Sequence, residues 1–200
     1  MAKRIIMDYI SRWIESQLAS WGQLFRVILL NGARQVGKST LLGHLLPNAQ
    51  RIVFEASLDP MGARSDPALF LRSHHPPVIL DEVQYAPELL GHLKVVVDES
   101  QMRGQYWLTG SQNLLLARGV AESLSGRVAI KTLWGLALGE VLGRPASSIL
   151  LRPILTLTGN ELLAGLQVGS PPIRMVEALW RGSFPECVPL FPGRSSCLAD

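Results

Sequence analysis

Apolar residues in this chain fall into short continuous runs that alternate with stretches of helical spacing. Five runs are bounded by polar or turn-forming residues, and they cover residues 25–31, 51–56, 78–82, 105–109 and 128–133. Continuous runs of this length predict strands that are buried on both faces, as in a parallel sheet. The stretches between them predict helices at residues 40–46, 68–72, 87–102 and 111–124. The alternation predicts an α/β fold in which helices cover both faces of a parallel sheet.

The beginning of the chain has a helical pattern of its own. Between residues 4 and 21, apolar side chains recur on one face, and Asp8, Arg12 and Glu15 lie between them. A signal peptide would need an uninterrupted apolar core, and a membrane-surface helix would need a basic polar face. We therefore expect a helix over residues 4–21 that packs on the edge of the domain.

The regular pattern weakens towards the end of the chain. From about residue 144 the apolar residues are irregularly spaced, although residues 160–167 and 172–182 could form two short helices. We therefore expect a core domain with its N-terminal helix at residues 1–143 and a short helical extension at residues 144–200.

The composition excludes several classes of protein. Hydrophobic residues make up 48% and charged residues 18% of the 200 residues, which excludes a disordered chain and suits a single core domain. The net charge of +3 does not by itself indicate a nucleic-acid partner. Cys187 and Cys197 make neither a disulfide framework nor a metal site, and no apolar stretch approaches the ~20 residues of a spanning helix. We expect a cytoplasmic protein without a membrane partner.

A complete phosphate-binding motif follows the first predicted strand. Residues 32–39 read Gly-Ala-Arg-Gln-Val-Gly-Lys-Ser, which matches the Walker A pattern G-x-x-x-x-G-K-[ST] at every fixed position. Between a strand and a helix, backbone N–H groups and the helix N-terminus converge on an anion. We expect Lys38 to reach the β- and γ-phosphates and the Ser39 hydroxyl to bind Mg²⁺. The predicted nucleotide-binding residues are Gly32, Ala33, Arg34, Gln35, Val36, Gly37, Lys38, Ser39 and Thr40.

Two adjacent carboxylates end the third predicted strand. Asp81 and Glu82 follow an apolar run, which is the Walker B arrangement. We expect Asp81 to hold the metal, usually through water, because Mg²⁺ keeps much of its hydration shell. Adjacent residues on a strand end point in different directions, so we assign Glu82 a separate role as the base that orients attacking water. The alternative is that these carboxylates cap the following helix.

Two further segments supply candidate site residues. Ser111 follows the fourth predicted strand and is our first choice for a residue that senses the γ-phosphate, ahead of Gln112 and Thr109. A helix cap is the alternative role for Ser111. Arg127 precedes the fifth predicted strand and could contact phosphate in cis or act as an arginine finger on a neighbouring subunit. A surface arginine near a helix end is the alternative for Arg127.

The ordered series of motifs resembles a prokaryotic AAA-type ATPase family, whose members pair an N-terminal AAA-like domain with a C-terminal domain of unknown function. The resemblance covers roughly residues 5–187 and rests on the segments LLNGARQVGKST (29–40), LDEVQ (80–84), LTGS (108–111), SLSGR (123–127) and GSFPE (182–186). It implies a P-loop NTPase fold with five parallel strands in the order 5-1-4-3-2, sandwiched by helices. Ser183 departs from the glycine that the family often has. Family members continue well beyond the last motif, so we expect a fragment or a chain without the C-terminal domain.

Together these features predict a Mg²⁺-dependent ATPase. The alternative is a nucleotide-dependent switch with little turnover that a partner or a missing domain completes. A GTPase would normally show an Asn-Lys-x-Asp motif, which the sequence lacks. A small-molecule kinase is less favoured, because Glu82 beside Asp81 suits water activation. Self-association, a protein partner and a nucleic-acid partner are all left open.

Overall fold

The computed structural model of the chain describes residues 9–100, 102–111, 114–144 and 182–185. In chain order the elements are α1 (Glu15–Leu24), β1 (Val27–Gly32), α2 (Lys38–Leu45), β2 (Gln50–Val53), the 3-10 helix η1 (Pro60–Gly62), α3 (Pro67–Ser73), β3 (Val78–Asp81), the 3-10 helix η2 (Val83–Tyr85), α4 (Leu89–Glu99), β4 (Tyr106–Ser111), α5 (Leu114–Ser123), β5 (Val128–Thr132) and α6 (Leu138–Val141). The short helices predicted at residues 160–167 and 172–182 fall outside the described residues, apart from residue 182.

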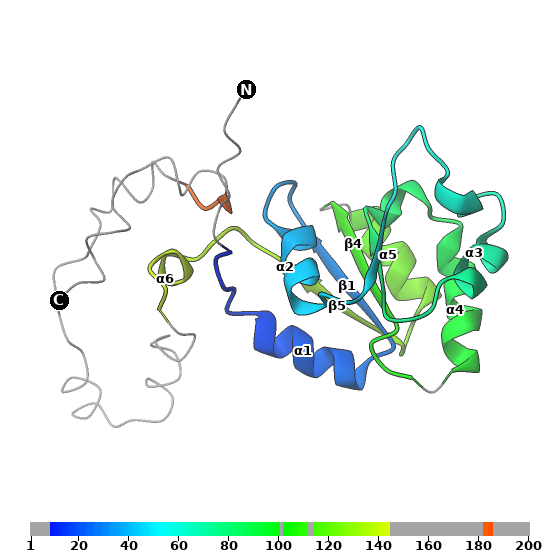
Figure 1. Cartoon of the computed structure of the whole chain (residues 1–200), viewed down its shortest axis with the longest axis horizontal. Helices are drawn as coiled ribbons and strands as arrows, with labels where there is room; N and C mark the ends of the chain where they lie inside the picture. The colour runs from blue at the N-terminus through cyan, green and yellow to red at the C-terminus, as the bar shows by residue number, and fades with distance from the viewer. Residues whose placement is uncertain (1–8, 101, 112–113, 145–181, 186–200) are drawn as a thin grey trace, which may run out of the picture. The chain divides into compact units, whose positions relative to one another are not determined.

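The chain divides into two compact units. One unit comprises Ile14–Trp134 and contains α1 through β5, and the other comprises Met1–Trp13 with Gly135–Asp200 and contains α6. The boundary near residue 143, which we expected from the sequence, stays a prediction. The larger unit carries the sheet and every motif singled out above except the segment at 182–186 (Figure 1).

The sheet has five parallel strands in the order β2-β3-β4-β1-β5. Read from the opposite edge, this is the predicted order 5-1-4-3-2, which is therefore confirmed. Strand β4 lies between β1 and β3, so the carboxyl ends of the three strands with predicted site residues are neighbours. Gly32 at the end of β1 is in register with Ser111 at the end of β4.

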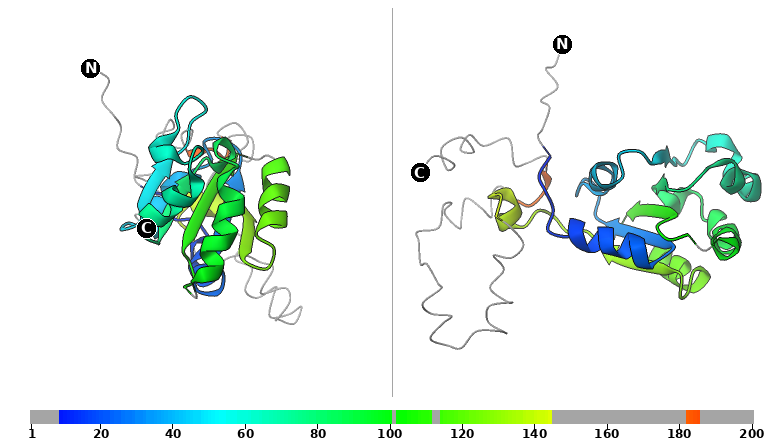
Figure 2. Two further views of the ribbon diagram at one scale, coloured as in Figure 1. Left: turned by 90° about the vertical axis from the view of Figure 1, so that its right-hand side faces the viewer. Right: turned by 60° about the horizontal axis from the view of Figure 1, so that its bottom comes forward.

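Helices cover both faces of this sheet. Helices α1 and α2 contact β1 on one face, whereas on the other α4 contacts both α3 and α5, and α5 contacts β5 (Figures 1 and 2). Residues of β1 are buried throughout, as expected for a strand with both faces covered. The predicted α/β fold is confirmed, and the ends of most predicted elements lie within a few residues of the observed ones.

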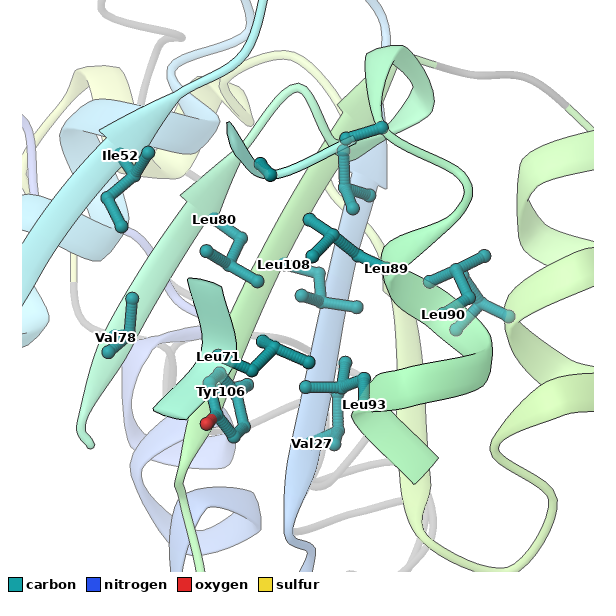
Figure 3. Packing of buried hydrophobic residues seen from close by; sticks show 14 of the residues in the cluster. Val27, Ile52, Leu71, Val78, Leu80, Leu89, Leu90, Leu93, Tyr106 and Leu108 are labelled. Atoms are coloured by element: carbon teal, nitrogen blue, oxygen red, sulfur yellow. The ribbon is translucent and has the colours of Figure 1, made fainter. Parts of the chain in front are cut away.

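A hydrophobic cluster lies between the sheet and the helices α3, α4 and α5 (Figure 3). Alternate strand residues such as Val27 and Leu29 in β1 point into this cluster, because successive side chains of a strand face opposite sides. Leu89, Leu90 and Leu93 of α4 meet them from the helix side. This packing holds the strands in place, and so fixes the position of the residues that follow their carboxyl ends.

The predicted helix over residues 4–21 is wrong for residues 9–14, because α1 begins only at Glu15. The smaller unit supplies the reason. Glu140 accepts hydrogen bonds from the Trp13 backbone N–H at 2.7 Å and from Arg12 Nε at 3.2 Å. A backbone N–H bonded to a carboxylate so distant in sequence is not available to a helical carbonyl. Residues 1–8 lie outside the described part of the chain.

Candidate functional site

The phosphate-binding motif forms the turn between β1 and α2, at the carboxyl edge of the sheet. Gly32 lies so close to Leu133 that a Cβ on Gly32 would collide with the Leu133 carbonyl oxygen. Gly37 has φ of 91°, in the left-handed region that disfavours residues with a Cβ. Both fixed glycines of the motif therefore have a steric reason to be glycine, and together they hold the loop against the sheet.

Lys38 is the first residue of α2 and is only 4% exposed. Its Nζ donates hydrogen bonds to the carbonyl oxygens of Gly32 at 3.1 Å and Ala33 at 2.8 Å. Burial lowers the pKa of Lys38 below its ordinary value, and the nearby Glu82 and Asp81 carboxylates oppose this effect. The ammonium group therefore lies inside the loop, held by backbone carbonyls and close to both acidic residues.

The remaining motif residues differ in exposure. Arg34 is exposed, and its Nη2 lies 3.4 Å from the Tyr85 hydroxyl. Gln35 and Thr40 are exposed as well, whereas Val36 is buried. The predicted phosphate-binding N–H groups lie where this loop leads into the N-terminus of α2.

Asp81 accepts hydrogen bonds from side chains of two other elements, α2 and β4. Ser39 Oγ donates to Asp81 Oδ1 at 2.9 Å, and Thr109 Oγ1 donates to the same oxygen. Thr109 is fully buried in β4, and its Oγ1 also accepts a hydrogen bond from the Glu82 N–H at 3.0 Å. The structure therefore brings together Ser39 and Asp81, as predicted from the sequence, and links them to Thr109, which came behind Ser111 among the sensor candidates.

Arg51 belongs to this cluster and was missed from the sequence. Its Nε donates to Asp81 Oδ2 at 3.0 Å, and its Nη2 donates to the same oxygen at 2.5 Å. Strand β2 pairs with β3 so that Arg51 lies opposite Ile79, two residues before Asp81. The sequence shows a cationic residue at the start of an otherwise apolar strand. Without the pairing register, it does not show which residue this arginine contacts.

Glu82 leaves the strand in a different direction from Asp81, as expected. Its backbone is left-handed, with φ 60° and ψ 47°, which is rare for a residue with a side chain. Its Oε2 accepts a hydrogen bond from Gln84 Nε2 at 2.5 Å. The Gln84 Oε1 atom is buried without a hydrogen-bond partner among the described residues. The Glu82 carboxylate is thus held by Gln84, beside the Asp81 cluster but not within it.

The other sensor candidates have different outcomes. Ser111 ends β4 in register with Gly32, so it lies beside the first glycine of the phosphate loop. Gln112 lies outside the described residues. The choice of Ser111 as the sensor stays a prediction, and the observed contacts of Thr109 make it an equal candidate.

Arg127 is not brought to the phosphate loop. It precedes β5 at the amino edge of the sheet, whereas the loop follows β1 at the carboxyl edge, and these strands are parallel neighbours. Its Nε donates to Asp98 Oδ1 at 2.6 Å and its Nη1 to the Ser125 carbonyl oxygen at 2.7 Å. This placement does not fit a contact with phosphate in cis. Action on a neighbouring subunit stays a prediction.

With this geometry described, comparison with known proteins gives the family. Residues 24–142 match the family described as an AAA domain. The chain belongs to this family. The matched residues run from the end of α1 to α6 and include every residue of the phosphate loop and of the Asp81 cluster. The part that they span is an AAA-type P-loop ATPase domain.

Curated relatives of this AAA domain come from mycobacteria. An uncharacterized protein of Mycobacterium tuberculosis and one of Mycobacterium bovis are each 35% identical to the chain over 141 residues. The match covers 68% of this chain and 32% of each relative. The chain therefore spans about a third of the length of the curated relatives it matches.

Solved structures similar to the AAA domain are distant in sequence. A Signal Transduction ATPase with Numerous Domains from Pyrococcus horikoshii, which has a tetratricopeptide repeat sensor, is 15% identical with a TM-score of 0.47, over 96% of this chain and 34% of that protein. AMPPCP-bound DnaA from Aquifex aeolicus is 16% identical with a TM-score of 0.40, over 78% of this chain and 55% of that one. Membership of the family rests on the sequence match.

The oxygen atoms of the AAA domain at this site suit Mg²⁺. The Ser39 hydroxyl and the Asp81 carboxylate are hard oxygen donors 2.9 Å apart, of the kind that magnesium prefers. Among the described residues, no group of three or more His, Cys, Asp and Glu side chains could enclose a metal ion. Mg²⁺ is typically held by one or two protein oxygens together with water and substrate phosphates, so this small donor set fits a metal that arrives with a nucleotide.

The part of the AAA domain and its flanks that the structure describes contains no helix that is long and apolar enough to cross a membrane.

Proposed function

We propose that this AAA domain binds ATP with Mg²⁺ and hydrolyses it to ADP and phosphate. The observation that carries the proposal is the convergence of Ser39, Asp81 and Thr109 beside the buried ammonium group of Lys38. Three segments distant in sequence supply these groups, and all lie at the carboxyl ends of neighbouring parallel strands. Ligands of open parallel sheets bind at that edge.

Each residue has a role that follows from its chemistry. Lys38 exchanges its hydrogen bonds to loop carbonyls for hydrogen bonds to the β- and γ-phosphates, and its charge offsets the negative charge that builds up during transfer. Ser39 and Asp81 hold Mg²⁺, which neutralises phosphate charge when bound. Glu82 accepts a proton from the water molecule that attacks the γ-phosphorus while the bond to the β–γ bridging oxygen breaks. Thr109 holds Asp81 and the Glu82 backbone in place.

ATP is favoured over GTP by the sequence, because the Asn-Lys-x-Asp motif that reads guanine is absent from all 200 residues. Competition between the two nucleotides for the purified protein tests this choice. Displacement of bound ATP analogue by GTP as readily as by ATP would contradict it.

Two substitutions test the binding and hydrolysis steps separately. We expect Lys38→Ala to weaken ATP binding and Glu82→Gln to keep binding but lower turnover by roughly 10²-fold or more, since loss of a general base costs that much. Isothermal titration and phosphate release measure the two steps. Lys94→Ala, an exposed lysine of α4, is the matched control. If Lys38→Ala binds ATP as tightly as wild type does, the site assignment is wrong. If Glu82→Gln hydrolyses ATP at the normal rate, Glu82 is not the base.

A second candidate function is a nucleotide-dependent switch with little turnover. The hydrogen bond from Gln84 to the Glu82 carboxylate favours it, because this bond holds the carboxylate beside the Asp81 cluster rather than within it. In this version a partner, either a second copy of the chain or another protein, would release Glu82. Tight binding with negligible turnover by the isolated protein favours the switch, whereas rapid hydrolysis by a dilute monomer removes it.

A further inference from the structure

Asp81 has no free acceptor position in the described structure. A carboxylate offers about four lone-pair sites to hydrogen-bond donors. In Asp81, Oδ1 accepts from the hydroxyl groups of Ser39 and Thr109, and Oδ2 accepts from Nε and Nη2 of Arg51. A metal-bound water molecule is also a donor, so Asp81 can accept one only after a protein donor has left.

Arg51 is the donor that can leave at the lowest cost. Its side chain is 45% exposed, whereas that of Asp81 is 2% exposed, so the guanidinium can be hydrated as soon as it is released. Thr109 is fully buried and also accepts from the Glu82 N–H, so its hydroxyl has no alternative partner in water. Ser39 must stay, because its own oxygen is the other proposed metal ligand.

Electrostatic repulsion also identifies Arg51 as the donor that leaves Asp81 when the metal binds. The guanidinium neutralises Asp81 through two hydrogen bonds to one oxygen, and a cation is repelled by a second cation on the same carboxylate. Arg51 extends from β2, an edge strand of the sheet, and the strand backbone does not need to move when the side chain swings away. The guanidinium and Mg²⁺ are therefore competitors for Asp81.

We propose that Arg51 is a displaceable counter-ion of Asp81: it occupies Oδ2 in the nucleotide-free site and releases it when Mg²⁺ and nucleotide bind. Arg51 thereby sets the magnesium concentration at which the site fills. It is a positioning residue rather than a catalytic residue, since it acts through Asp81. This inference rests on the proposed function.

The test is a magnesium titration of nucleotide binding, which requires no turnover. A fluorescent non-hydrolysable ATP analogue is added to wild type, Arg51→Gln and Arg51→Lys, and the Mg²⁺ concentration for half-maximal binding is measured. We expect that concentration to fall by up to about fivefold in Arg51→Gln, the range for loss of a partly exposed ion pair, and to fall less in Arg51→Lys, which keeps the charge without the fork. Arg72→Gln, at an exposed arginine of α3, should match wild type.

Three outcomes overturn the inference. An unchanged magnesium midpoint means that Arg51 does not compete with the metal. A higher midpoint means that Arg51 orients Asp81 for the metal. Equal losses of affinity with and without Mg²⁺ mean that Arg51 contacts phosphate. If wild type binds no nucleotide at any magnesium concentration, the proposed function itself fails, and the two failures are thereby distinguished.

A spectroscopic measurement follows the Arg51 side chain in the wild-type protein itself. The Arg51 Nε–H group gives a ¹⁵N–¹H signal that its hydrogen bond to Asp81 should shift and protect from exchange, and the signal missing from Arg51→Gln identifies it. Addition of Mg²⁺ with the analogue should move this signal and speed its exchange, whereas the analogue in EDTA should not. A signal that is unchanged by Mg²⁺ and analogue, while binding is observed, contradicts the displacement.

Discussion

At the scale of single residues, the Thr109 hydroxyl joins β3 to β4. It donates to Asp81 Oδ1 and accepts from the Glu82 N–H, so both acidic residues depend on it. Its side chain is fully buried, which means that no water molecule is at hand to replace it. One hydroxyl group therefore fixes the carboxylate of one acidic residue and the backbone of the next.

Removal of this hydroxyl should lower the stability of the fold even when the side chain keeps its shape. Thr109→Val leaves a buried carboxylate oxygen and a backbone N–H each short of one partner, and we expect it to lower the free energy of unfolding by about 1–3 kcal/mol. Thr109→Ser keeps the hydroxyl and should lose less. Urea unfolding followed by circular dichroism measures both. Equal stability of wild type and Thr109→Val would show that the hydroxyl does not hold the site.

The sequence predicted the residues of the phosphate loop and the acidic pair, because the loop geometry demands particular residue types at fixed spacing. It did not predict the contact of Arg51 with Asp81 or the contacts of Thr109. Their roles depend on which strands are neighbours and in which register, and neither property is encoded in local spacing. Strand β4 lies between β1 and β3, so Thr109 reaches Asp81 directly.

At the scale of elements, α4 is held by one apolar face. Leu89, Leu90, Leu93 and Val97 are buried against the sheet, whereas Val95 on the same helix is 56% exposed. The spacing of the buried residues is that of a helix packed on one side. The stability contributed by α4 therefore resides in these side chains, which lie on the side of the sheet that Figure 3 shows.

We expect Leu93→Ala to lower the free energy of unfolding by about 2–5 kcal/mol, as is usual when a fully buried leucine is truncated. Val95→Ala is the control from the same helix and should be close to neutral, because an exposed β-branched residue contributes little to packing and alanine favours the helix. Thermal or chemical unfolding of both variants measures the difference. Equal costs would mean that α4 is not packed as described.

Elements with a strong period were predicted within a few residues, and the one clear error has a tertiary cause. All five strands and helices α2 to α5 were expected from apolar runs and helical spacing. The first helix was placed too early, since residues 9–14 have a helical apolar pattern, but Arg12 and Trp13 among them bond to Glu140 instead. The long-range hydrogen bonds to this carboxylate outweigh the local helical pattern there, and nothing in the local sequence predicts them.

At the scale of the whole sheet, the proposed site and a cluster of ion pairs lie at opposite edges. The carboxyl edge holds the phosphate loop and Asp81. At the amino edge, Asp98 accepts from Arg26 at 2.9 Å and from Arg127 at 2.6 Å. The hydrogen bond and charge of Arg127 lower the pKa of Asp98 below its ordinary value. This ion cluster joins α4 to the beginnings of β1 and β5.

The lowered pKa of Asp98 predicts a dependence of stability on pH. A carboxylate whose pKa is lower in the folded state contributes stability above its unfolded pKa of about 3.9, and the contribution is lost as pH falls through the folded pKa. Wild type should therefore be more stable than Asp98→Asn at neutral pH, and the difference should shrink below about pH 4. Glu99→Gln, an exposed neighbouring carboxylate, is the control. A gap that is constant between pH 7 and pH 3 would contradict this assignment.

The position of β4 between β1 and β3 also dictates when the site can form during synthesis. As the chain emerges from the ribosome, β1, β2 and β3 are complete before β4 exists, yet β1 and β3 are not neighbours in the finished sheet. The loop with Lys38 and the strand that ends at Asp81 can take their places in the sheet only when β4 inserts between β1 and β3 and supplies Thr109. A nucleotide can therefore recognise only chains that have passed this step.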